Sequence, residues 1–184
     1  MIVKLKCEPF LIQFFQAYFE TSTPIEFPTR HDFNNQLDFL LTKPPKDWEP
    51  EDYGENTMAI KAPYFENKNV LFNWHLSDRA QAVFVSRLTC FFKIVFNSEM
   101  NQSLVLGFNK KESIQIFQEK YRLGQDTNDM LEKSYSRYIK TKIARKWRLS
   151  QKNLVSIALV LSGVWYVVIP DAFDVLCDIA DLIV

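Results

Sequence analysis

The chain has 184 residues, of which 47% are hydrophobic and 24% charged, close to the average of globular domains. That length fits one domain, with or without an appendage, and the composition excludes extended disorder. Lys and Arg number 22, as do Asp and Glu, so the net charge is zero. No overall electrostatic field therefore recruits nucleic acid or acidic lipid, and either partner must bind a local patch.

Aromatic residues dominate the apolar composition. Phe occurs sixteen times, whereas Gly occurs only four times. Phenylalanine contributes a large buried area, and a low glycine content leaves few flexible turns. The chain is therefore expected to fold around a compact, helix-rich core.

Hydrophobic periodicity and capping residues predict the elements in chain order. They are a strand at 2–6, a helix opening at Pro9, a helix capped by Thr29, a strand at 57–65, a helix capped by Ser77, a helix opened by Asn109 and Glu112, and a long helix from Asp126 or Thr127 to about Arg148. Pro24 and Pro28 interrupt the pattern between the first two helices. The fold class is α+β and predominantly helical, with a small N-terminal strand pair and a helical C-terminal half.

Three regions follow from this order. They are an N-terminal α+β region at 1–75, a helical region with a basic helix at 76–150, and apolar and acidic C-terminal helices at 151–184. The last region either packs with the rest in one compact unit or serves as a membrane anchor.

Charge is distributed unevenly along the chain. Between Lys133 and Lys152 there are eight basic residues and no acidic one, and seventeen uncharged residues follow from Leu154 to Pro170. The apolar positions Leu131, Tyr135, Ile139, Ile143 and Trp147 are spaced as one helical stripe. We expect this stripe to anchor the helix to the core, which would display the cations in a fixed row.

The basic helix is the predicted nucleic-acid-binding element. With 110–122 and a turn near Gly124, it resembles a helix-turn-helix pair, although the turn exceeds the usual three or four residues. Its cations would contact phosphates, and Tyr138 or Trp147 would stack on bases of a single-stranded target. The predicted nucleic-acid-binding residues are Lys133, Arg137, Tyr138, Lys140, Lys142, Arg145, Lys146 and Arg148.

Several short motifs carry a family resemblance. They are LKCEPFL at 5–11, PIEFP at 24–28, LSDR at 76–79, IFQEKY at 116–121 and LEKSYSRY at 131–138. Over residues 3–148 the chain resembles a family of small, uncharacterised proteins of bacterial prophages and mobile elements. The resemblance implies a DNA-associated, non-enzymatic role through Lys133, Tyr135, Arg137 and Tyr138.

The apolar run has two interpretations. Leu154 to Ile169 is sixteen residues without a charge, whereas a membrane span needs about 17–25. A packed or peripheral helix is favoured over a span, in which the Lys/Arg cluster would stay on the cytoplasmic side. The end of the chain is similar to YkvA-type small membrane-associated domains. The candidate membrane segment comprises Leu154, Leu161, Trp165, Tyr166 and Ile169.

No pattern indicates catalysis. The two histidines, His31 and His75, lack metal-ligand spacing, and no phosphate-binding loop, GxSxG motif or CxxC pair is present. Cys7 and Cys90 are expected to be small buried residues in a reducing compartment. The Asp171, Asp174, Asp178 and Asp181 row suits pairing with the basic helix better than metal binding. We expect no catalytic residue, no cofactor and no metal.

Three functions remain open. The first is a non-enzymatic nucleic-acid-binding or regulatory protein of phage or mobile-element type, with DNA or a protein as its partner. The second is a tail-anchored or peripheral membrane interaction protein. The third is an assembly protein that forms homo-oligomers through its basic helix and acidic tail. A cytoplasmic location is expected because the N-terminus lacks a signal peptide, and the second function would place 154–170 against the inner face of a membrane.

Overall fold

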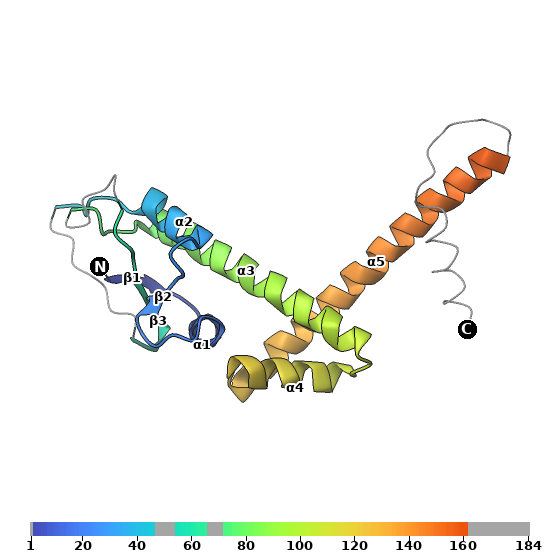
Figure 1. The fold of residues 1–184 in the computed structure, drawn as a ribbon, viewed down its shortest axis with the longest axis horizontal. Helices are drawn as coiled ribbons and strands as arrows, with labels where there is room; N and C mark the ends of the chain where they lie inside the picture. Colours follow the sequence, from blue (N-terminus) through green and yellow to red (C-terminus); the bar gives the residue numbers. More distant parts are fainter. Residues whose placement is uncertain (1, 47–53, 66–71, 162–184) are drawn as a thin grey trace. The chain divides into compact units, whose positions relative to one another are not determined.

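The computed structural model describes residues 2–46, 54–65 and 72–161, with side chains as far as Leu149 (Figure 1). The elements within these ranges are β1 (Ile2–Lys6), α1 (Pro9–Tyr18), β2 (Ile25–Glu26), α2 (Asp32–Leu40), β3 (Thr57–Lys61), α3 (Asp78–Val105), α4 (Lys110–Tyr121) and α5 (Asn128–Leu161). Short 3-10 turns cover Gly54–Asn56 and Gln125–Thr127. The fold is α+β and predominantly helical, as predicted.

A three-stranded sheet has the order β1-β3-β2. β1 pairs with β3 antiparallel, with Val3 opposite Ile60 and Leu5 opposite Met58. These four side chains are buried, whereas alternate residues of β1 are exposed, so one face of the sheet supports the core. The predicted strand pair is confirmed as part of this sheet.

The third strand was not predicted. β2 pairs with β3 in parallel, with Ile25 opposite Ile60. It is only two residues long and lies between Pro24 and Pro28, where the sequence pattern indicated only a break. Its pairing depends on a partner strand distant in the chain, so local periodicity carries no signal for it.

Local capping chemistry sets most helix starts as predicted. Ser77 accepts a hydrogen bond from the Ala80 amide at the start of α3. At α4, the Asn109 side chain accepts from the Glu112 amide at 3.0 Å, and the Glu112 carboxylate accepts from the Asn109 amide at 2.9 Å. This reciprocal pair satisfies two backbone donors that the helix itself cannot.

The predicted cap of α2 is wrong. His31, not Thr29, occupies the N-cap, and its Nδ1 atom accepts a hydrogen bond from the Phe33 amide at 3.3 Å. The His31 ring also lies against four phenylalanine rings, among them Phe33 at 4.6 Å between centroids. Packing of the imidazole therefore selects this residue as the cap, although Thr has the higher intrinsic preference.

The buried stripe of α3 differs from the one that a 3.6-residue period predicts, which consists of Ala80, Val83, Phe84, Leu88, Phe91 and Val95. Its apolar members fall at every fourth position, at Ala80, Phe84, Leu88, Phe92, Phe96 and Met100. Phe91 and Val95, which were predicted to be buried, are half-exposed, and Val83 is exposed. Each step of four residues rotates the stripe by about 40° around the helix. Over 28 residues the stripe therefore faces α2 and α1 first and α4 later.

The abundant phenylalanines form the core. Phe14 on α1 contacts Phe92 of α3 at 5.0 Å, Phe117 of α4 at 6.3 Å and Tyr121 of α4 at 4.9 Å between ring centroids. Phe15 contacts Phe33 of α2 at 5.8 Å. One continuous aromatic network thus joins four helices, which explains the unusual composition.

The chain divides into two compact units, residues 1–132 and 133–184. The first unit contains the sheet, α1 to α4 and the first turn of α5 (Figure 1). It therefore joins the predicted N-terminal region, 1–75, to most of the predicted helical region, 76–150. The second unit begins at Lys133, the first residue of the predicted binding row.

Candidate nucleic-acid interface

Helix α5 carries every predicted nucleic-acid-binding residue. It spans Asn128–Leu161, 34 residues, and so extends beyond the predicted end near Arg148. No proline or glycine interrupts the chain between these limits, which explains the continuation. Leu154 and Leu161 of the candidate membrane segment thus belong to the same helix. Trp165, Tyr166 and Ile169 lie outside the described residues, as do the Asp171, Asp174, Asp178 and Asp181 row and Cys177.

The first turn of α5 is held firmly within the first unit. Leu131 is fully buried, and Glu132 forms an ion pair with Lys110 of α4 at 2.7 Å. Gln118 of α4 donates to the Thr127 hydroxyl at 3.3 Å, just before the helix begins. The hydrogen bond and charge of Lys110 lower the pKa of Glu132, which therefore stays ionised at neutral pH.

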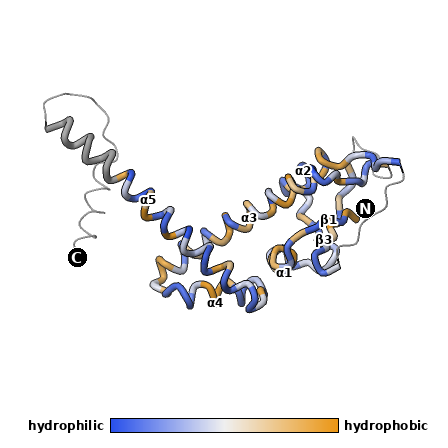
Figure 2. Tube along the Cα trace, turned by 180° about the vertical axis from the view of Figure 1, so that it is seen from behind, coloured by the Kyte–Doolittle hydropathy of each residue, from blue (hydrophilic) through white to orange (hydrophobic). Residues whose placement is uncertain are grey.

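The predicted cations are all on the surface. Lys133, Arg137, Lys140, Lys142, Arg145, Lys146 and Arg148 are exposed. Within the described ranges, no ion pair joins Lys133, Arg137, Lys140, Arg145, Lys146 or Arg148 to a carboxylate. Figure 2 shows hydrophilic residues recurring along the coloured part of α5, interrupted by hydrophobic ones.

Five of these cations share one side of the helix. At about 100° per residue, the side chains of this group fall within about 140° of the helix circumference. The group, called the basic face below, consists of Lys133, Arg137, Lys140, Arg145 and Arg148. It extends for about 22 Å along the axis. Lys142 and Lys146 lie on the opposite side, so the predicted set does not form a single surface.

Repulsion between the cations of the basic face destabilises the helix that carries them. Lys133 and Arg137 are four residues apart, and Arg137 and Lys140, like Arg145 and Arg148, are three apart. Like charges at these spacings repel, by about 0.2–0.5 kcal/mol per pair. Repulsion of this kind is relieved when a polyanion binds the row, which makes a phosphate backbone a complementary ligand.

The predicted anchoring stripe is only partly correct. Leu131 and Tyr135 are buried and Ile139 is half-buried, but Ile143 is 51% and Trp147 68% exposed. Leu149 is also exposed. Because each stripe member is four residues after the last, the stripe rotates by about 40° per step and leaves the buried side. The regular four-residue spacing was the signal in the sequence that could have predicted this exposure.

Tyr138 lies differently from the cations. Its ring is half-buried, and the Lys142 ammonium lies 5.9 Å from the ring centroid. Burial raises the pKa of the Tyr138 hydroxyl above its ordinary value. One turn along, the Thr141 hydroxyl donates to the Arg137 carbonyl at 2.9 Å. Tyr138 is thus packed under Lys142, a residue of the same helix.

The basic residues of α4 behave differently from those of α5. Lys110 pairs with Glu132, and Lys120 pairs with Glu99 of α3 at 2.6 Å. Ion pairs therefore neutralise two of the three basic residues of α4, Lys110 and Lys120. The connection between α4 and α5 runs from Arg122 to Thr127 and contains a 3-10 turn, so it is longer than the turn of a helix-turn-helix motif.

The cysteines and the second histidine do not form a reactive site among the described residues. Cys7 is buried, and burial raises the pKa of its thiol to about 12, which makes it a poor nucleophile. Cys90, predicted to be buried, is exposed because it lies on the outer side of α3. His75 is buried, and its backbone pairs with that of Thr42. Among the residues that the structure describes, no three His, Cys, Asp or Glu side chains are grouped as a metal site would require.

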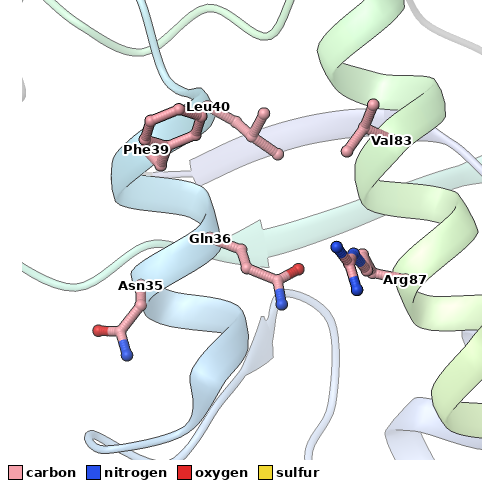
Figure 3. Close-up of a pocket in the computed structure, with 6 residues that line it drawn as sticks. All are labelled: Asn35, Gln36, Phe39, Leu40, Val83 and Arg87. Atoms are coloured by element: carbon pink, nitrogen blue, oxygen red, sulfur yellow. The ribbon is translucent and has the colours of Figure 1, made fainter.

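A shallow pocket of about 300 Å³ lies between α2 and α3 (Figure 3). Phe39 is 85% exposed at its rim and Arg87 extends into it from α3. The residues lining the pocket are Asn35, Gln36, Phe39, Leu40, Val83 and Arg87. Arg87 is the one ionisable group of this lining, so the pocket offers no acid–base pair.

Within the described residues, no helix is both long and apolar enough to cross a membrane. No family model, curated protein or solved structure matches the chain. The resemblance to prophage and mobile-element proteins, and that of the tail to YkvA-type domains, therefore stay predictions.

Proposed function

We propose that this protein is a non-enzymatic nucleic-acid-binding protein, of the regulatory kind found in prophages and mobile elements. The basic face of α5 contacts phosphates, with Arg137 and Lys140 near its middle. One observation carries the proposal. Five exposed cations occupy one side of a helix, and no described carboxylate pairs with them. Phosphate contacts from such a row supply most of the affinity in sequence-independent binding.

The supporting geometry is the firm hold on the first turn of α5. Leu131 is buried, and the Lys110–Glu132 ion pair joins this turn to α4. The backbone that carries the basic face is therefore already helical before a ligand binds. A preordered row of cations loses less conformational entropy on binding than a flexible basic tail does.

The test is a pair of charge reversals in the full-length protein. Arg137→Glu with Lys140→Glu removes two central contacts and adds two repulsive charges. We expect affinity for a labelled 30-nucleotide DNA to fall by on the order of tenfold or more at moderate salt. The matched control is Arg87→Glu with Lys93→Glu, which makes the same change of net charge on α3, where both side chains are exposed.

The control separates a local interface from general charge attraction. If the α3 double variant binds DNA like the wild type while the α5 variant does not, the interface is on α5. If both variants lose affinity equally, or if neither does, the proposal is wrong.

A second candidate function is supported by the exposed apolar side chains. Ile143, Trp147 and Leu149 lie among the cations of α5, and a mixture of apolar and basic residues is typical of helices on an anionic membrane surface. In this alternative a cytoplasmic protein rests on the inner face of a membrane. Sedimentation with vesicles containing phosphatidylserine, compared with neutral vesicles, tests it. Absence of the protein from both pellets would exclude it.

A further inference from the structure

We infer that the ligand of the basic face is single-stranded nucleic acid, and that Trp147 stacks on one of its unpaired bases. This inference rests on the proposed function and specifies its ligand. It also chooses between the two aromatic residues that the sequence offers for stacking, Tyr138 and Trp147.

The position of Trp147 places it beside the basic face. Around the helix, Trp147 lies about 20° from Lys140 and about two turns further along the axis. Arg145 and Arg148 are its close neighbours in the chain. A strand whose phosphates follow the basic face therefore brings its bases past the indole ring.

The exposure of Trp147 is the second observation. The ring is 68% exposed although it is the largest apolar side chain of α5. A base stacked on it removes that apolar surface from water, and such stacking contributes about 1–3 kcal/mol per base. In a duplex the base faces are already stacked on one another, and only base edges are accessible in the grooves. A flat exposed indole beside cations therefore suits an unpaired base.

Tyr138 is less suited to this role. It is half-buried, and the Lys142 ammonium already occupies one side of its ring at 5.9 Å. Because the side chain is half-buried, a loss of affinity on its replacement would not report on stacking alone. Trp147 is thus the side chain whose removal reports on stacking without affecting the core.

The experiment measures the affinity of the full-length protein for one 30-nucleotide mixed-sequence DNA, single-stranded and as a blunt duplex, by fluorescence anisotropy. Trp147→Ala is expected to weaken single-strand binding by about 5- to 150-fold, equivalent to about 1–3 kcal/mol, and to change duplex binding less than about twofold. Trp147→Phe should retain most of the affinity. Phe39→Ala, which removes an exposed aromatic ring from α2, is the matched control and should change neither.

The outcomes distinguish this inference from the proposed function. If Trp147→Ala weakens both DNA forms equally, or neither, stacking is wrong while binding by the basic face stands. If the wild type binds neither form, both proposals fail. If Trp147→Ala abolishes self-association or binding to phosphatidylserine vesicles and leaves single-strand binding intact, the indole serves a second copy or a membrane, and the inference is overturned.

Discussion

Phe14 illustrates how single residues determine this fold. Its side chain is fully buried, and its ring contacts the rings of Phe15, Tyr18, Phe92, Phe117 and Tyr121. These rings come from α1, α3 and α4, so the single side chain of Phe14 contacts residues of three helices. A smaller residue would leave a cavity that the surrounding rings fill incompletely.

Phe14→Ala is therefore expected to lower the free energy of unfolding by about 3–5 kcal/mol. Urea denaturation of the full-length protein, followed by circular dichroism, measures the change. Phe39→Ala is the control, because Phe39 is 85% exposed, and it should cost no more than about 0.5 kcal/mol. Equal costs for the two variants would contradict the packing described here.

His31 predicts a pH dependence. Burial lowers the pKa of His31 below the ordinary value of 6.5, and the Asp32 charge opposes this only partially. The unfolded chain therefore takes up a proton at a higher pH than the folded chain does. Stability from the neutral imidazole is present above the unfolded pKa and is lost as the pH falls from there through the lower folded pKa.

Comparison of the wild type with His31→Asn isolates this effect. Asn caps helices well but does not titrate, so the variant keeps the hydrogen bond to the Phe33 amide and loses the ring packing. The wild type should be the more stable protein at pH 8, and its advantage should shrink between about pH 7 and 5, around the ordinary His pKa. An advantage that stays constant or grows in acid would be inconsistent with a lowered pKa.

At the scale of elements, helices α3 and α5 both carry an apolar stripe that rotates around the helix axis. In each, apolar residues recur every fourth position, whereas the α-helix has 3.6 residues per turn. In α3 the rotating stripe stays buried because successive partners cover it. In α5 the same rotation carries Ile143 and Trp147 to the surface. Periodicity alone predicts the helix, but which stripe members are covered depends on tertiary neighbours.

The charges of α5 predict opposite effects on stability and binding. Arg137→Glu places a carboxylate four residues after Lys133 and three before Lys140, which converts two repulsive pairs into attractive ones. The helix should be stabilised locally by about 0.8–2 kcal/mol, because each of the two pairs loses a repulsion and gains an attraction of about 0.2–0.5 kcal/mol. Affinity for DNA should fall at the same time, because a phosphate contact is lost.

Hydrogen exchange of the amides from 133 to 149 measures this local stability. Exchange should be slower in Arg137→Glu than in the wild type. Arg137→Gln removes the repulsion without adding attraction, so it should slow exchange by about half as much. Faster exchange in Arg137→Glu would mean that Arg137 has a structural role, and its effect on binding would then not identify an interface.

At the scale of the whole molecule, the sequence predicted the class of the fold, the capping of α3 and α4, and the segregation of charge. It did not predict β2, the His31 cap or the exposure of Trp147. The first two depend on partners distant in the sequence, namely β3 for Ile25 and rings such as Phe19 and Phe91 for His31. The exposure of Trp147 follows instead from the four-residue spacing of its stripe, which rotates around the helix. The candidate site was found because cation density is visible locally, whereas its division into two sides of α5 required the helix geometry.

The most direct test of the central claim is the salt dependence of DNA affinity for the full-length protein. Five phosphate contacts on a single strand predict that log affinity falls with log salt concentration with a slope of about −3.5. Arg137→Glu with Lys140→Glu should make the slope shallower by about 1.4, whereas Arg87→Glu with Lys93→Glu should leave it unchanged. A slope near zero, or the same shallowing in both double variants, would contradict phosphate binding by the basic face of α5.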